Sequence, residues 1–253
     1  MIDTAWDLSG QVALVTGSST GIGRAIALEL GRAGADVVCH GRDDAAEELV
    51  LELRNLGRRA FGMRADLCDH ASHDELVRRA IAEFGRLDIL VNNAGLIRRA
   101  PAVDYSDDDW QTLLEVNLTA VFRLSRAAGR QMLAQGRGNI VNIASLLSFQ
   151  GGIRVPAYSA TKGAVAQLTK ALANEWAASG VNVNAIAPGY IATDNTADLR
   201  KDPERSRQIL ERIPAGRWGE AADIAGAAVF LCSRASRYIH GHVLVVDGGW
   251  MAR

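Results

Sequence analysis

Tyr158 and Lys162 stand four residues apart in the segment RVPAYSATKGA, a spacing that can support proton transfer. Pro156 suits the first position of a helix, so we expect a helix to begin there and to carry both side chains on one face. A nearby ammonium favours the phenolate and should lower the pKa of the Tyr158 hydroxyl from its reference value near 10. A tyrosine with a lowered pKa is a usable general acid and base near neutral pH.

Two further polar residues, Ser145 and Asn117, stand where they could assist such a proton transfer. Ser145 ends the strand-like run GNIVNIAS thirteen residues before Tyr158, and its hydroxyl can hold a substrate oxygen on which charge develops. Asn117 lies in the run DDDWQTLLEVNLTAVF, where a buried amide is costly unless it is hydrogen-bonded. Each residue alone is compatible with a purely structural role, and it is their combination that predicts catalysis.

The segment VALVTGSSTGIGRAIALEL reads as a strand, a glycine-rich turn and a helix, which is an arrangement that binds phosphate groups. Its glycines permit a tight turn and a close approach of the backbone to a pyrophosphate, while hydroxyl side chains add donors. The N–H groups at the start of the helix should face the anion. The predicted contacts are Gly17, Ser19, Thr20, Gly21, Ile22 and Gly23.

Further motifs follow TGxxxGIG along the chain: ADL at Asp66, NNAG at Asn92–Gly95, VNL at Asn117, Ser145 with the YSATK segment, and PGYIAT from Pro188. In this order and spacing, the motifs resemble those of the short-chain dehydrogenase/reductase family over nearly the whole chain. The resemblance implies hydride transfer between a nicotinamide dinucleotide and a carbonyl or alcohol, with Tyr158 as proton donor and acceptor and without a metal. It also implies that Lys162 holds the nicotinamide ribose and that Asn117 holds a water beside the lysine.

The same resemblance assigns further cofactor contacts. Asp66, followed by Leu67, should bond the adenine amino group, and the turn of Asn93, Ala94 and Gly95 should lie along the adenosine ribose. The nicotinamide side should be lined by Pro188, Gly189, Ile191 and Thr193, together with Tyr158 and Lys162.

The end of the second predicted strand, VVCHGRDD, bears on the choice of cofactor. An acidic side chain here selects NAD, whereas an arginine accommodates the 2′-phosphate of NADP. Gly41 appears where an acid would stand and Arg42 follows it, which favours NADP(H) over NAD(H). Asp43 and Asp44 leave NAD open, because they could pair with Arg42 or contact the ribose themselves.

Several segments outside these motifs, including GLIRRAP, LLSFQGGIRVPAY and IPAGRWG, are similar to the branch of the family that acts on deoxy sugar acids of the 2-deoxy-D-gluconate or 2-dehydro-3-deoxy-D-gluconate type. Such a substrate needs a carboxylate anchor, and an arginine fork binds a carboxylate at two points. The predicted substrate contacts are Arg99, Ser145, Gln150, Arg154 and Tyr190, with Arg154 favoured as the anchor.

Three other functions stay open on the sequence. A gluconate 5-dehydrogenase and a 3-oxoacyl carrier-protein reductase share the same motifs and differ in the loops that contact the substrate. A regulator that binds the dinucleotide without turnover belongs to another class, and the intact Ser145, Tyr158 and Lys162 argue against it.

Short β-branched runs alternating with helical segments position these residues. We expect strands at Gln11–Thr16, Asp36–His40, Arg59–Arg64, Ile89–Asn92, Asn139–Ile143, Asn182–Ile186 and Val243–Val246, and helices that include Ile22–Ala33, His73–Phe84, Asp107–Leu133, Ala157–Ala178 and Ala221–Leu231. This alternation predicts an α/β fold, one doubly wound, Rossmann-like domain with a seven-stranded parallel sheet and helices on both faces. Residues 1–253 should form one catalytic domain, with an insertion at about 190–218 that covers the substrate.

The overall composition limits the partners of the protein. Its 28 Lys and Arg residues nearly balance 29 Asp and Glu residues without long runs of one sign, which argues against nucleic-acid and membrane-surface binding. Three scattered cysteines indicate neither a disulfide framework nor a zinc site. The first ten residues do not resemble a signal peptide, so we expect a cytoplasmic protein, and the family resemblance implies a homotetramer.

Overall fold

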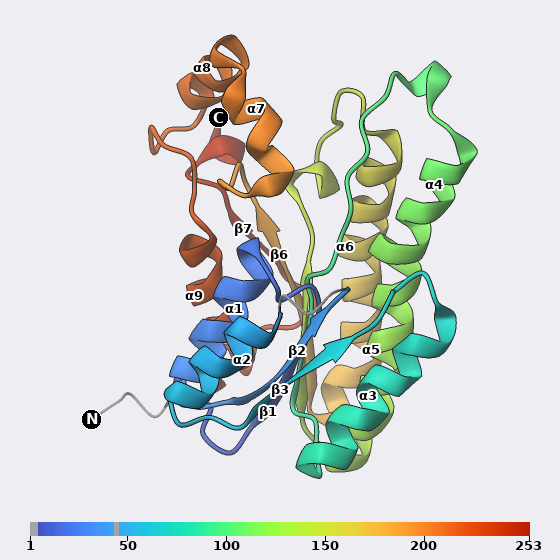
Figure 1. Ribbon diagram of the computed structural model, residues 1–253, viewed down its shortest axis with the longest axis vertical. Coiled ribbons are helices and arrows are strands. Elements are labelled where there is room, and N and C mark those ends of the chain that lie inside the picture. Colours follow the sequence, from blue (N-terminus) through green and yellow to red (C-terminus); the bar gives the residue numbers. More distant parts are fainter. Residues whose placement is uncertain (1–4, 43–45) are drawn as a thin grey trace.

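Seven short, mostly apolar segments form one parallel sheet in the computed structural model, which describes residues 5–42 and 46–253 (Figure 1). The strands are β1 (Val12–Val15), β2 (Asp36–Gly41), β3 (Ala60–Arg64), β4 (Ile89–Asn92), β5 (Gly138–Ile143), β6 (Val181–Pro188) and β7 (Val243–Val246). All seven predicted strands are found. The strands Ile89–Asn92 and Val243–Val246 have the predicted ends. The others differ by at most two residues at either end, because hydrogen bonding to neighbours rather than β propensity decides where pairing stops.

In the strand order β3-β2-β1-β4-β5-β6-β7, β2 and β3 lie on one side of β1, whereas β4 to β7 lie on the other side. The chain runs outward from β1 to β3 and then returns to the other side of β1. Open α/β sheets bind their ligands at the carboxyl ends of the strands at such a switch point. The turns that follow β1 and β4 therefore border the expected ligand crevice.

Helices cover both faces of the sheet (Figure 1). One layer contains α1 (Gly21–Arg32), α2 (Ala46–Asn55) and α9 (Ala221–Cys232), and the other contains α3 (His70–Phe84), α4 (Asp107–Leu114), α5 (Ala120–Gln135) and α6 (Pro156–Trp176). Along β1, Ala13 and Val15 join the apolar cluster under the first layer, whereas Val12 and Leu14 join the cluster under the second. A strand buried on both faces reads as a continuous apolar run, and the predicted fold class is confirmed.

Helix α6 begins at Pro156, as the sequence predicts, but the long helix expected at Asp107–Leu133 is interrupted. A π-helical turn, Glu115–Thr119, separates α4 from α5 and contains Asn117. Such π-helical turns insert an extra residue per turn and are frequent at functional sites. Short 3₁₀ turns occupy Ala102–Asp104, Leu146–Ser148, Ala177–Ser179, Asp194–Thr196, Arg234–Ser236 and Trp250–Ala252.

The segment between β6 and α9 contains α7 (Ala197–Lys201) and α8 (Pro203–Arg212), drawn in orange beyond the carboxyl ends of the strands in Figure 1. A small apolar cluster attaches it to the body of the protein. The buried members of this cluster are Leu146, Ile209, Ile213 and Trp250. A bridge between Ile191 and Gly219 joins the two ends of the segment.

Candidate active site

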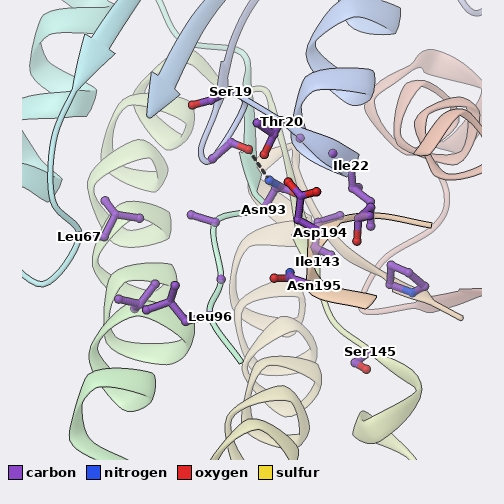
Figure 2. A pocket seen from close by; sticks show the side chains of 18 of the residues that line it. Ser19, Thr20, Ile22, Leu67, Asn93, Leu96, Ile143, Ser145, Asp194 and Asn195 are labelled. Atoms are coloured by element: carbon purple, nitrogen blue, oxygen red, sulfur yellow. Dashed lines mark hydrogen bonds between the residues drawn. The ribbon is translucent and has the colours of Figure 1, made fainter. Parts of the chain in front are cut away.

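A cavity of about 630 Å³ opens at the carboxyl edge of the sheet and is shown in Figure 2. It is bordered by the turns that follow β1 to β6. The predicted cofactor residues that line it are Gly17, Ser19, Thr20, Gly21, Ile22, Gly23, Arg42, Asp66, Leu67, Asn93, Ala94, Gly95, Tyr158, Lys162, Pro188, Gly189, Ile191 and Thr193. All the residues predicted to bind the dinucleotide thus border one cavity, together with Ser145.

The glycine turn after β1 has a backbone that only glycine accommodates. Gly17 and Gly21 have φ values of 62° and 56°, in the left-handed region. A Cβ atom on Gly23 would lie 2.2 Å from the Gly17 carbonyl oxygen, so α1 packs directly against the turn. Thr20 precedes α1 in extended conformation, and within the described part of the chain its side chain does not cap the helix. The first N–H groups of α1 are therefore available to an anion.

The turn after β4 braces the glycine turn from the side. The Asn93 amide nitrogen Nδ2 donates to the carbonyl oxygens of Thr16 and Gly17, each at 2.9 Å. In return, the Thr16 hydroxyl accepts from the backbone N–H groups of Asn93 and Ala94 at 3.0 and 3.1 Å. These four bonds hold the two turns in a fixed relation, and Figure 2 labels Asn93, Ser19 and Thr20 around the same pocket.

The side of the cavity next to β2 and β3 carries Asp66 and Arg42. Asp66 is exposed after β3, and its Oδ1 atom accepts from the Cys68 N–H at 2.9 Å. Arg42 is exposed after β2, and its carbonyl oxygen accepts from Arg64 Nε at 3.0 Å. Asp43 and Asp44, the acids that left NAD open, lie outside the described residues.

Ser145, Tyr158 and Lys162 meet on the opposite side of the cavity. Ser145 follows β5, and its hydroxyl accepts from the Leu147 N–H at 3.2 Å. It is close enough to Tyr158, on the first turn of α6, to lower the pKa of the phenol. Lys162 lies one turn further along α6, 4% exposed, with Nζ 5.6 Å from the centroid of the Tyr158 ring. Its ammonium donates to the Ile143 carbonyl at 2.5 Å. The predicted helical spacing of the tyrosine and lysine is thus present in the structure.

The pKa of Tyr158 does not follow the expectation from the sequence. Burial raises it, and this effect exceeds the lowering by the hydrogen bond from Ser145 and by the positive charge of Arg99. Burial also lowers the pKa of Lys162 to about 8, and its ammonium is directed at the Ile143 carbonyl rather than at the phenol. The expected lowering of the Tyr158 pKa by Lys162 is therefore wrong for the chain without a bound ligand, because desolvation dominates both groups.

Asn117 is fully buried in the π-helical turn and does not line the cavity itself. Its Oδ1 accepts from the Leu96 N–H at 2.8 Å, and its Nδ2 donates to the Leu96 carbonyl at 2.9 Å. A weaker contact of 3.4 Å joins Nδ2 to the Thr161 hydroxyl. The amide thereby fixes the chain just after Gly95, and the cost of burying it is met by these bonds.

The other predicted substrate residues stand outside the lining of this cavity. Arg99 is exposed, donates to the Asn195 carbonyl at 3.1 Å and is close enough to affect the pKa of Tyr158. Arg154 is exposed, and its φ of 63° is the left-handed conformation that glycine favours. Gln150 is half-buried, and Tyr190 borders a separate cavity of about 190 Å³. Asp194 and Asn195, which the sequence reasoning did not include, do line the main cavity (Figure 2).

The family model described as enoyl-(acyl carrier protein) reductase, which represents short-chain dehydrogenases/reductases, matches residues 17–251. The 2-dehydro-3-deoxy-D-gluconate 5-dehydrogenase of Dickeya dadantii (strain 3937) is 51% identical over 254 residues, covering 100% of both chains. The chain belongs to the short-chain dehydrogenase/reductase family. The family resemblance found in the sequence motifs is thereby confirmed, and members of this family use NAD or NADP.

Two solved structures of other short-chain dehydrogenases/reductases are similar over almost their full length. A protein from Beutenbergia cavernae assigned as an NAD(P)-dependent gluconate 5-dehydrogenase, with NADP at low occupancy, is 52% identical with a TM-score of 0.95, covering 98% of this chain and 100% of that one. A protein from Agrobacterium tumefaciens assigned as a 2-deoxy-D-gluconate 3-dehydrogenase, with bound NADP, is 52% identical with a TM-score of 0.92, covering 99% and 100%.

Two general features of this short-chain dehydrogenase/reductase complete the description. Among the described residues, no group of three or more His, Cys, Asp or Glu side chains is arranged to hold a metal ion. In the same part of the chain, each helix is too short or too polar to cross a membrane.

Proposed function

We propose that this chain transfers a hydride between NADP(H) and the secondary alcohol or ketone of a deoxy sugar acid, of the 2-dehydro-3-deoxy-D-gluconate or 2-deoxy-D-gluconate type. The observation that carries the proposal is that Ser145, Tyr158 and Lys162 line the same cavity as the glycine turn. This places a proton donor and an anion-binding turn around one space.

The residues of the glycine turn fit a dinucleotide. A Cβ on Gly17 would lie 2.9 Å from the Ala94 Cα, and one on Gly23 would strike the turn itself, so the glycines leave the backbone free to approach a pyrophosphate. We assign the pyrophosphate to the start of α1, adenine to Asp66, and the nicotinamide to the side of Pro188 and Thr193. When bound, the cofactor supplies or accepts the hydride.

In the proton-transfer step, Tyr158 gives its hydroxyl proton to the substrate oxygen during reduction and takes a proton back during oxidation. Ser145, which lines the cavity with Tyr158, holds the same oxygen as charge develops on it. Lys162 is buried and cationic below about pH 8, so it can hold ribose hydroxyls of the cofactor. We assign Asn117 a supporting role in this proton transfer, because its side chain fixes Leu96 through two hydrogen bonds.

The preference for NADP over NAD is proposed from Arg42. Its exposed guanidinium lines the adenosine side of the cavity, where it can bind a 2′-phosphate in a two-point fashion. The NADP bound in the Beutenbergia cavernae and Agrobacterium tumefaciens proteins supports the same choice.

For the substrate carboxylate we propose Arg99 as the anchor. The positive charge of Arg99 is close enough to Tyr158 to lower the pKa of its hydroxyl, so an anion bound by Arg99 would lie near the proton donor. The Asn195 carbonyl holds one of its Nη atoms, which leaves other guanidinium donors for a ligand. Arg154, favoured by the sequence, stays a prediction as anchor, as do contacts from Gln150 and Tyr190.

The nearest alternative is a gluconate 5-dehydrogenase, which the assignment of the Beutenbergia cavernae protein favours. We further propose that residues 1–253 act as one catalytic domain, that residues 190–218 form a cover over the substrate, and that the enzyme is a cytoplasmic homotetramer. The position of α7 and α8 beyond the strand ends supports the role of the cover (Figure 1).

The test is a spectrophotometric panel of deoxy sugar acids, gluconate, 5-ketogluconate and an acetoacetyl thioester, each with both cofactors. We expect the highest kcat/KM with a deoxy sugar acid and NADP(H). A preference for gluconate would select the alternative function, and a preference for the thioester would select a carrier-protein reductase. Dinucleotide binding without turnover of any carbonyl would indicate a regulator.

A further inference from the structure

His40, at the end of β2, is a buried histidine to which the reaction gives no role. It is 2% exposed and lines the cavity beside the glycine turn. A buried imidazole needs partners for its ring nitrogens, because an unpaired buried polar atom costs the full price of desolvation. Its partners therefore indicate what it does.

The two ring nitrogens of His40 bond to two different turns of the cofactor cavity. The Gly17 N–H donates to Nδ1 at 3.2 Å, and Nε2 lies 3.1 Å from the Ala65 carbonyl oxygen. A backbone N–H can only donate and a carbonyl can only accept, so these contacts require a neutral ring with its proton on Nε2. Burial, which lowers the pKa of His40, favours the same form.

The backbone of His40 adds to this connection. Its carbonyl oxygen accepts from the Ser18 N–H at 2.9 Å and from the Ser18 hydroxyl at 3.3 Å. The residue thus fixes Gly17 and Ser18 on one side. On the other side it fixes Ala65, the neighbour of the cavity-lining Asp66. The glycine turn is held by His40 at one side and by Asn93 at the other.

We propose that His40 is a positioning residue for the dinucleotide: its neutral imidazole sets the glycine turn, at the Gly17 N–H, against the turn that carries Asp66. The inference rests on the proposed dinucleotide binding and adds to it a residue that no cofactor atom needs to touch. A fixed spacing between these turns matters because the cofactor must reach both at once.

Two amide substitutions each keep one of the two hydrogen bonds that the His40 imidazole makes. The Oδ1 atom of Asn occupies the place of Nδ1 and can accept from Gly17, whereas the amide of Gln reaches the place of Nε2 and can donate to Ala65. We compare wild type with His40→Asn, His40→Gln and His40→Leu. Measurements are the Kd of NADPH by fluorescence titration, the KM of the dinucleotide, kcat and Tm.

We expect His40→Gln and His40→Leu to raise the Kd and KM of the dinucleotide about tenfold, as for one buried hydrogen bond, while kcat at saturation changes by less than about twofold. His40→Asn keeps the Gly17 bond and loses only the Ala65 bond, so it should show an intermediate effect, with the Kd raised by no more than about threefold. Should His40→Leu fail to fold, the comparison of Asn with Gln decides.

Unchanged dinucleotide binding in His40→Gln would overturn the inference. So would a fall in Tm, kcat and affinity that is equal in all three variants, since that is the behaviour of a packing residue. A wild-type protein that binds neither dinucleotide would instead remove the proposed function. The two failures are therefore distinct.

Discussion

The two sides of the cavity are built differently. On the dinucleotide side, the buried His40 and Thr16 and the half-buried Asn93 hold a backbone turn through hydrogen bonds of 2.9 to 3.3 Å. On the substrate side, the candidates are exposed side chains on loops, such as Arg99 and Arg154. The tyrosine on α6 lies between the two sides.

This difference follows from what each side must bind. A pyrophosphate is bound by N–H groups, whose positions depend on glycines and on buried bonds that any large change would disturb. A particular sugar acid is selected by a few charged and polar side chains, which can be exchanged on exposed loops without disturbing the core. We therefore expect substitutions to have large effects on the dinucleotide side and smaller, substrate-specific effects on the other.

The largest effect that tests this contrast is expected for Gly23→Ala. The added Cβ would lie 2.2 Å from the Gly17 carbonyl and 2.3 Å from Asn93 Nδ2, so the turn must move. We expect the Kd of NADPH to rise by more than about a hundredfold, measured by fluorescence titration. The matched control is Gly226→Ala on α9, where, apart from the adjoining backbone of the helix, no heavy atom of the described residues lies within 4 Å of the added Cβ. Equal behaviour of the two variants would contradict the account of the turn.

A smaller effect is expected on the substrate side, for Arg99→Ala. Loss of a carboxylate anchor should raise the KM of the sugar acid about tenfold and leave kcat within about twofold. Because the charge of Arg99 lowers the pKa of Tyr158, the limb of the pH profile for alcohol oxidation that rises as Tyr158 is deprotonated should also move to higher pH.

The matched control for Arg99 is Arg154→Ala, which removes the same charge from another exposed loop position. We expect its KM to stay near that of wild type. A raised KM in Arg154→Ala with none in Arg99→Ala would show that the sequence-based choice of Arg154 was right and that the geometric choice was wrong.

The smallest expected effect concerns the pH dependence of stability. The folded-state pKa of Lys162, about 8, lies below its ordinary value of 10.5, so between these values the unfolded chain binds more protons than the folded one. The free energy of unfolding of wild type, relative to Lys162→Met, should therefore rise as the pH increases from about 8 to about 10. Urea denaturation at several pH values measures it, and a flat difference would show that burial leaves this ammonium unperturbed.

Much of the fold could be predicted because its strands are short apolar runs between turn residues, and periodicity reveals such elements directly. The limits of α6 were predictable for a similar reason, since Pro156 marks a helix start. The π-helical turn at Glu115–Thr119 was not, because it depends on the bonds between Asn117 and Leu96, two residues far apart in sequence.

The candidate site shows the same division. The glycine turn and the Tyr158 and Lys162 pair are local motifs, so the sequence located them. His40 was missed because its bonds to Gly17 and Ala65 arise only when three strands are assembled. The rise in the Tyr158 pKa was missed because burial, unlike residue spacing, is not visible in a sequence.

The most direct test of the central claim is the turnover of 2-dehydro-3-deoxy-D-gluconate by wild type and by Tyr158→Phe, together with the Kd of NADPH for each. The Phe variant keeps the ring of Tyr158 but lacks the hydroxyl that would transfer the proton. We expect wild type to turn over this substrate, and the variant to bind NADPH with similar affinity while its kcat falls by at least about a hundredfold. Near-normal turnover by Tyr158→Phe would contradict the account.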